Sequence, residues 1–161
     1  MNLDTALSFT GHRDYDVNSN EQLYSTLEVA YRDGYRIFLS GMAVGFDMAA
    51  AEAVLRLRQC YADVELVCVV PFRGQEQKFS SQDKIRYQAI LDVADRIETL
   101  AEHYFVACYA MRNNYLLENS SCLVAYYDGS KGGTHYTYSR ALKLKHRVIN
   151  IHRSSQLSLF D

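Results

Sequence analysis

The segment from Ser40 to Asp47 constrains the fold of this chain more than any other. It reads Ser-Gly-Met-Ala-Val-Gly-Phe-Asp and follows the apolar run at residues 37–39. The helical pattern after it places four apolar side chains on one face: Ala50, Ala53, Val54 and Leu57. A buried strand, a glycine turn and a helix, in this order, place backbone N–H groups at the helix start, where a phosphate binds readily.

Two other segments repeat this arrangement. Thr10-Gly11-His12-Arg13 follows the apolar run at 7–9, and the glycine-rich stretch from Gly129 to Thr134 follows the run at 122–126. The carboxyl ends of strands in an open parallel sheet lie along one edge, so the three loops are expected to converge on one ligand. The sequence therefore predicts a site for a nucleotide-like molecule.

Composition limits the class of protein. The chain has 161 residues, which fits one domain, and 48% of them are hydrophobic, without a stretch of about 18 apolar residues that could span a membrane. The first residues lack the pattern of a signal peptide, so a cytoplasmic location is expected. The four cysteines show no CxxC spacing, which favours reduced thiols over a disulfide, and no metal site is predicted.

The charge balance disfavours one class of partner. A formal net charge of −2 and a pI near 6.2 argue against broad adhesion to nucleic acid, so direct DNA binding is not expected. Basic residues do gather near the C-terminus, and a solvated face explains them better than a binding patch. Membrane binding is not expected either, and the sequence leaves open whether the protein forms a homo-oligomer.

The pattern of apolar runs predicts an α/β fold. Strands are expected at 7–10, 36–40, 64–70, 121–127 and 147–151, with a weaker one at 96–100; helices are expected at 20–33, 47–60, 80–94, 106–118 and 134–145. Alternation of this kind indicates a Rossmann-like, doubly wound, mainly parallel sheet of five or six strands with helices on both faces. We assign residues 1–152 to this domain and 153–161 to a C-terminal tail.

Several candidate residues admit two interpretations. Arg13 could clamp a phosphate or form a surface ion pair, and Asp47 could bind a ribose hydroxyl or cap its helix. Arg112 and Asn113 could face the same edge, although an exposed helix surface is the stronger interpretation. The glycine spacing does not match GxGxxG, and no carboxylate ends the strand at 64–70, which disfavours an NAD-linked dehydrogenase.

Taken together and in order, these motifs resemble the YpsA-like branch of the SLOG (Smf/DprA–LOG) superfamily. The resemblance spans about residues 7 to 151 and includes Val70-Pro71-Phe72, Arg112-Asn113 and Tyr127-Asp128-Gly129. It implies a Rossmann-like domain that binds a nucleotide-derived ligand of the NAD or ADP-ribose kind, acting as a sensor or adaptor with no required cofactor. The implied ligand-binding residues are Gly11, Arg13, Gly41, Met42, Gly45, Asp47, Gly132, Gly133 and Thr134.

One departure from the family pattern bears on catalysis. LOG enzymes carry a catalytic glutamate three residues after the threonine of their glycine motif, and Thr137 stands there in this chain. A binding protein is therefore favoured over an enzyme. The alternative is a hydrolase that cleaves the N-glycosidic or phosphoribosyl bond of a nucleotide, with a carboxylate supplied by Asp47, Asp128 or Glu118; the sequence does not choose among them.

The last residues carry a separate motif. Gln156-Leu157-Ser158-Leu159-Phe160 resembles the QL(S/D)LF pentapeptide with which many bacterial proteins dock on the DNA polymerase sliding clamp. Its apolar side chains would fill pockets on the clamp, which suggests an accessory role in DNA processing. The alternative is that Leu157, Leu159 and Phe160 fold back onto the chain's own core.

Overall fold

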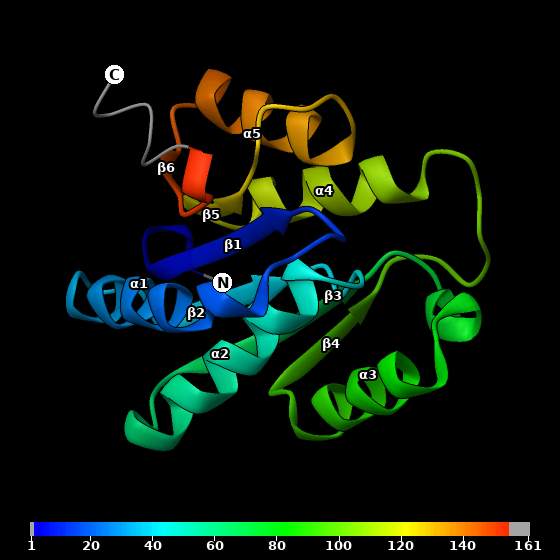
Figure 1. Cartoon of the computed structure of the whole chain (residues 1–161), viewed down its shortest axis with the longest axis horizontal. Helices are drawn as coiled ribbons and strands as arrows, with labels where there is room; N and C mark the ends of the chain where they lie inside the picture. The colour runs from blue at the N-terminus through cyan, green and yellow to red at the C-terminus, as the bar shows by residue number, and fades with distance from the viewer. Residues whose placement is uncertain (1, 155–161) are drawn as a thin grey trace.

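The fold is a six-stranded, all-parallel sheet with helices on both faces (Figure 1). It is taken from a computed structural model that describes residues 2–154. The strands are β1 (Ala6–Gly11), β2 (Ile37–Ser40), β3 (Glu65–Val70), β4 (Arg96–Thr99), β5 (Cys122–Tyr126) and β6 (Arg147–Asn150). The helices are α1 (Asn20–Arg32), α2 (Phe46–Cys60), α3 (Ser81–Val93), α4 (Cys108–Glu118) and α5 (Gly133–Lys143).

The strand order creates a crevice in the middle of the sheet. It runs β4-β3-β2-β1-β5-β6, so the chain builds outward from β1 in one direction and returns to β5 on its other side. Neighbouring strands pair in parallel register, for example Leu7 with Cys122 and Phe38 with Leu66. The order reverses between β1 and β5, and ligands of such sheets bind beyond the strand ends at that point.

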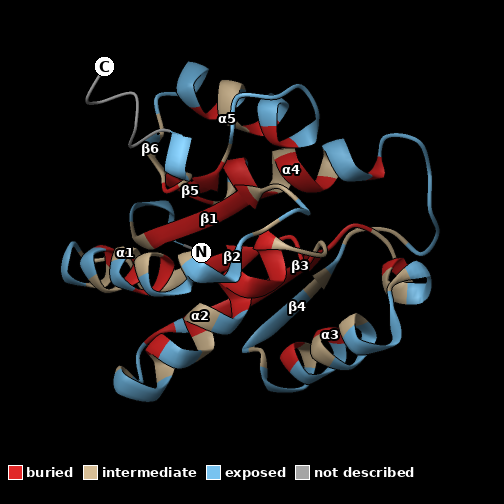
Figure 2. Cartoon of the chain, in the orientation of Figure 1, coloured by how far each residue is buried: buried red, intermediate tan, exposed pale blue. Residues whose placement is uncertain are grey.

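The alternating side chains of the central strands supply two apolar faces. Leu7 and Phe9 point into the larger core under α1, α2 and α3, whereas Ala6 belongs to the core on the α4 side. Figure 2 shows the central strands buried and β4 exposed at one edge of the sheet. Burial on both faces explains why these strands read as continuous apolar runs.

The predicted elements are confirmed to within about two residues at each end, including the weak strand that became β4. Gly34 ends α1 as expected, with φ at 107° and the Tyr35 amide bonded to the Ala30 carbonyl. Within residues 2–154 no helix is long and apolar enough to cross a bilayer. The clamp-docking motif, Gln156 to Phe160, lies outside the described residues and stays a prediction.

Candidate functional site

The loops after β1, β2 and β5 are bonded to one another at the carboxyl edge of the sheet. The Phe46 amide, at the start of α2, donates to the His12 carbonyl at 3.1 Å, and the His12 amide donates to the Tyr126 carbonyl at 3.3 Å. The Asp128 amide in turn donates to Nε2 of His12 at 3.0 Å. The three glycine-bearing loops thus meet at one place, as their strand order requires.

A cavity of about 580 Å³ opens between these loops and the first turns of α4 and α5. The predicted residues that line it are Gly11, Arg13, Asp47, Gly133 and Thr134, joined by Tyr109, Arg112 and Asn113 from α4. The cavity lies at the point where the strand order reverses, which is the usual ligand site of doubly wound sheets.

Arg112 is the residue for which the stronger sequence interpretation, an exposed helix surface, is wrong. Together with Asn113 it is buried rather than exposed on the helix surface, with 7% and 9% of the two residues accessible. Its Nη1 donates to the Gly41 carbonyl and its Nε to Oδ1 of Asn113, both at 2.8 Å. A methyl group on Gly41 would lie 2.6 Å from Cδ of Arg112. Glycine at position 41 therefore leaves the space that the buried Arg112 side chain occupies.

Asp47 is the acidic group whose pKa responds to the charge of that guanidinium, although the two side chains form no ion pair. Its carboxyl group is buried at the first turn of α2, and Oδ2 accepts the Ala43 amide at 3.2 Å. Burial raises the pKa of Asp47 to about 6, while the charge of Arg112 and the Ala43 bond act in the opposite direction. Asp47 does not cap α2, because the residue at that position is Gly45. It is a buried acid in the wall of the cavity.

Arg13 differs from Arg112 in being exposed. No acidic side chain within residues 2–154 lies in ion-pair distance of it, so the predicted surface pair with Asp14 or Asp16 does not form. The main chain of Arg13 packs closely against Gly45. The φ of Gly45 is 92°, and a Cβ added there would lie 2.2 Å from the Arg13 carbonyl oxygen. Gly45 is thus needed where the two loops meet, and it lines a hollow between α1 and α2 and not this cavity.

The start of α5 closes the other side of the cavity. Gly132 precedes the helix with φ at 142°, and Thr134 is buried with 9% of its surface accessible. Within the described part of the chain, the amides of Gly133, Thr134 and His135 have no hydrogen-bond partner. Such amides at a helix start, with the positive end of the helix dipole, favour an anion.

Met42 and Gly132, like Gly41 and Gly45, belong to the predicted site but do not line the cavity. Met42 is fully buried; its amide donates to Oγ of Ser40, and its carbonyl accepts from Nε2 of Gln75. Gly132 shapes the entry to α5 without lining the cavity. The amides of Met42, Ala43 and Phe46 all have internal partners, so most of the Ser40–Asp47 turn is used to build the site.

Of the three carboxylates that could serve a hydrolase, the structure places one in the cavity. Asp128 is at the surface, where bonds from the hydroxyl and amide of Ser130 lower its pKa to about 2. Glu118 ends α4 and lines a separate groove near Leu100. Thr137, at the position of the missing glutamate, is buried and donates its hydroxyl to the Gly133 carbonyl. Asp47 alone of these acids lines the cavity.

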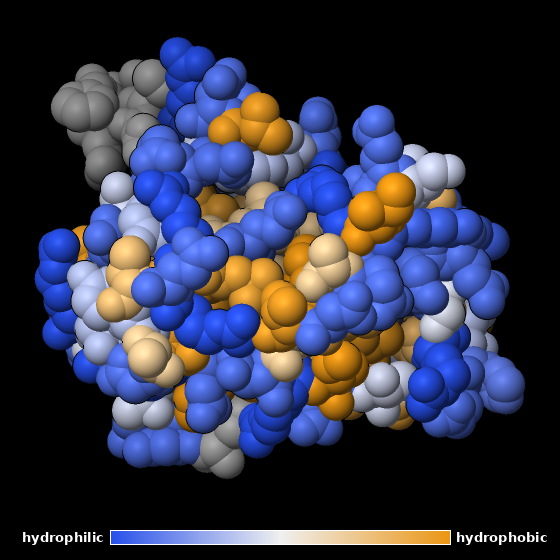
Figure 3. Space-filling view, turned by 90° about the horizontal axis from the view of Figure 1, so that it is seen from below, coloured by the Kyte–Doolittle hydropathy of each residue, from blue (hydrophilic) through white to orange (hydrophobic). Residues whose placement is uncertain are grey.

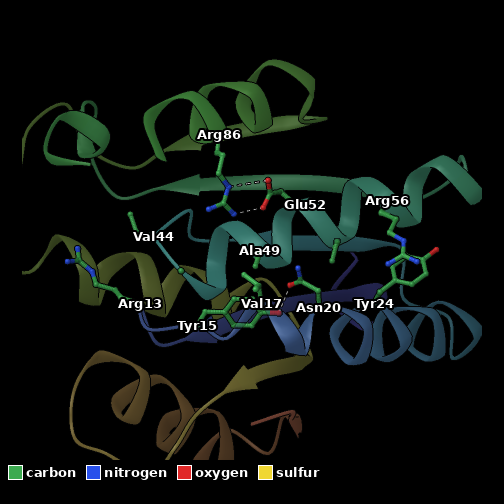
Figure 4. Close-up of a pocket in the computed structure, with 12 residues that line it drawn as sticks. Arg13, Tyr15, Val17, Asn20, Tyr24, Val44, Ala49, Glu52, Arg56 and Arg86 are labelled. Carbon is green, nitrogen blue, oxygen red and sulfur yellow. Dashed lines mark hydrogen bonds and ion pairs between the residues drawn. The ribbon is translucent and has the colours of Figure 1, made fainter. Parts of the chain in front are cut away.

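A separate hollow lies between α1 and α2, and Arg13 forms part of its wall as well. It holds about 350 Å³ above a floor that includes Ala49 and Ala53. Figure 3, which views the molecule from below, shows hydrophobic residues gathered near the middle of that face among charged ones. Two of the cations that line it are paired, Arg86 with Glu52 (Figure 4) and Arg56 with Glu21. Arg13 also lines this hollow and has no ion-pair partner within residues 2–154.

The raised pKa of Asp47 predicts a distinct dependence of stability on pH. Folding raises this pKa from 3.8 to about 6, so the folded protein holds the proton more tightly than the unfolded chain. That stabilisation is complete below about pH 4 and is lost as the pH rises through about 6. Asparagine cannot titrate, so the free energy of unfolding of the parent relative to Asp47→Asn should fall over this range. Urea unfolding of both proteins at a series of pH values measures it; parallel curves would contradict it.

The fold and the cavity define a Rossmann-like α/β protein with a polar crevice at the carboxyl edge of a parallel sheet. Two solved structures share this fold: DNA processing protein A (DprA) of Streptococcus pneumoniae, with a TM-score of 0.63 and 15% identity over 90% of this chain, and DprA of Helicobacter pylori, with 0.65 and 16% over 91%. The chain covers 49% and 64% of those two proteins, respectively.

Sequence comparison identifies the family to which the chain belongs. The YpsA family model, described as the YspA SLOG family, matches residues 7–155, and the chain belongs to this family. The SPbeta prophage-derived protein YoqJ of Bacillus subtilis is 29% identical over 82% of this chain and 86% of its own length. A UPF0398 protein of Halalkalibacterium halodurans is 28% identical over 69% of this chain and 60% of its own length. The expected SLOG membership is confirmed.

Proposed function

We propose that this protein binds a nucleotide-derived ligand of the NAD or ADP-ribose kind in the cavity at the carboxyl edge of the sheet. The phosphate contacts Arg13 and the amides at the start of α5, on either side of the crevice. The observation that carries the proposal is that Arg13 lies exposed at the mouth of the cavity with no ion-pair partner in residues 2–154. A guanidinium so placed can make a charge-assisted, bidentate contact with phosphate.

The interior of the cavity favours binding over turnover. Arg112 is already engaged by Gly41 and Asn113, so its role is to keep the wall positively charged and rigid. Thr137 occupies the position of the LOG glutamate and is turned into the protein. We accordingly propose that the protein is a sensor or adaptor, in which ligand binding changes the partners that the protein can contact.

The test is a calorimetric titration with AMP, ADP-ribose and adenosine. Arg13→Ala should weaken AMP and ADP-ribose binding at least tenfold, about 1.4 kcal/mol, because a phosphate contact is lost. Adenosine lacks phosphate, so its affinity should not respond. Arg147→Ala is the matched control, since it removes a half-exposed arginine, paired with Asp33, at the opposite edge of the sheet. Equal losses in both variants, or no phosphate dependence, would reject the proposed site.

A hydrolase is the second candidate, and Asp47 is the observation in its favour. A buried carboxyl group with a pKa near 6 can exchange a proton at neutral pH, and it lines the cavity beside Arg112. Incubation with AMP, NAD and ADP-ribose should then release a free base at a rate that Asp47→Asn abolishes. Binding without release of base supports the sensor.

Single-stranded DNA is a third candidate, because the work on H. pylori DprA describes a single-stranded DNA binding mode for that protein. The net charge of −2 weighs against a similar role here. A gel shift with single-stranded oligonucleotides at several salt concentrations tests it directly, since contacts to the phosphate backbone lose affinity steeply as salt rises.

A further inference from the structure

A second cavity adjoins the proposed phosphate site. It holds about 690 Å³ and lies between the turn after β2, the loop after β3 with its short 3-10 helix η3 (Gln75–Lys78), and the segment that leads into α4. Arg13, Ala43 and Tyr109 line both this cavity and the first one. The two cavities are therefore adjacent parts of one cleft, and Arg13 lies at the boundary between them.

An aromatic cluster forms one wall of the second cavity. The ring centroids of Phe72, Tyr104 and Tyr109 lie 5.5 to 6.3 Å apart, in edge-to-face or tilted contact. Tyr104 and Tyr109 are 59% and 41% exposed, even though they lie at the rim of a cleft and not on a convex surface. Edge-to-face packing fixes the rings, and the Arg112 guanidinium lies over the Tyr109 ring, 5.6 Å from its centroid. The exposed parts of Tyr104 and Tyr109 can serve as a stacking surface for a flat ligand.

The side chains that line the second cavity carry more positive than negative charge. Arg13 and Lys78 line it, and neither has an ion-pair partner in the part of the chain that is described. Its acid, Asp83, is close to Arg86, at 3.4 Å. Gln75 is held in the wall, because its Nε2 contacts both the Met42 carbonyl and the Tyr87 hydroxyl. The cavity thus combines free cations with aromatic rings, which suits a nucleotide unit.

We propose that the ligand contains two nucleosides joined through phosphates, and that the second base stacks on the cluster of Phe72, Tyr104 and Tyr109. The bridging phosphates lie at Arg13, where the two cavities meet. The first nucleoside then occupies the cavity of Arg112 and Asn113. This inference rests on the proposed function, and it narrows the class of ligand: a dinucleotide that carries a second base, as NAD does, rather than ADP-ribose, which has none.

The test compares ligands that differ by one base. Diadenosine diphosphate and ADP-ribose share an adenosine, two phosphates and a second ribose, and only the former carries a second adenine. Stacking of one base on aromatic side chains predicts that diadenosine diphosphate binds at least fivefold more tightly. Tyr104→Ala should bring its affinity down to that of ADP-ribose and leave ADP-ribose and AMP unchanged. Tyr104→Phe, which keeps the ring, should retain the advantage.

The outcomes separate this inference from the proposed function. If AMP and ADP-ribose bind but diadenosine diphosphate gains nothing, the dinucleotide assignment is wrong and the phosphate site stands. If Tyr104→Ala weakens AMP as well, a single base occupies the aromatic cavity and the assignment is again wrong. If none of the three binds, the proposed function itself fails. Tyr104 is largely exposed, so thermal unfolding should show that its variants fold as the parent does.

Discussion

Replacement of Arg112 by methionine should lower the free energy of unfolding by about 3 kcal/mol and abolish nucleotide binding. The change keeps an unbranched side chain of similar bulk but removes the buried charge. It leaves the Gly41 carbonyl and Oδ1 of Asn113 without their donor, and Asp47 without its counter-charge. Removing a buried positive charge is costly because the nearby Asp47 carboxylate then stays desolvated without a compensating charge.

The loss of unfolding free energy caused by Arg112→Met should depend on pH and on the presence of Asp47. It should be larger at about pH 8, where Asp47 is ionised in the parent, than at about pH 5, where it is mostly protonated. The double variant Arg112→Met with Asp47→Asn should lose less than the sum of the two single changes. Urea unfolding at both pH values measures these quantities. A loss independent of pH, with strictly additive variants, would show that the two groups do not interact.

The second large effect is expected at Gly45. Gly45→Ala should destabilise the protein by about 3 to 4 kcal/mol, because the residue has positive φ and the new methyl group meets the Arg13 main chain. Gly129→Ala is the matched control. It has nearly the same φ, 94°, with nothing within 4 Å of the added atom, so it should cost only about 1 to 2 kcal/mol.

Thermal unfolding of the two alanine variants measures the difference. If the variants lose the same stability, the approach of the two loops is not what requires glycine at position 45. If Gly45→Ala loses more, as expected, the variant should also bind nucleotides poorly, because its Arg13 loop no longer holds its position. Weak binding by a fully stable variant would indicate instead that Gly45 touches the ligand.

The arrangement of elements could be predicted because each one depends on neighbours in the sequence. The run at 37–39, the glycines that follow it and the helical spacing of Ala50, Val54 and Leu57 are signals within about 20 residues. Parallel pairing then follows from the alternation of strands and helices, and it places the three loops at one edge. On this basis Arg13 and Asp47 could be named as candidates with two interpretations each, and the resemblance to the SLOG superfamily assigned them, with Thr134, to the ligand site.

The contacts inside the cavity depend on residues far apart in the chain, and only the tertiary structure decided them. The roles of Gly41 and Gly45 follow from what packs on them, the Arg112 side chain and the Arg13 main chain, neither of which leaves a trace in local sequence. Arg112 looked like a surface residue, because its burial depends on contact with Gly41 in the loop after β2, far away in the sequence. Periodicity reports which face of an element is apolar, whereas the burial of a charge depends on the partners that folding brings to it.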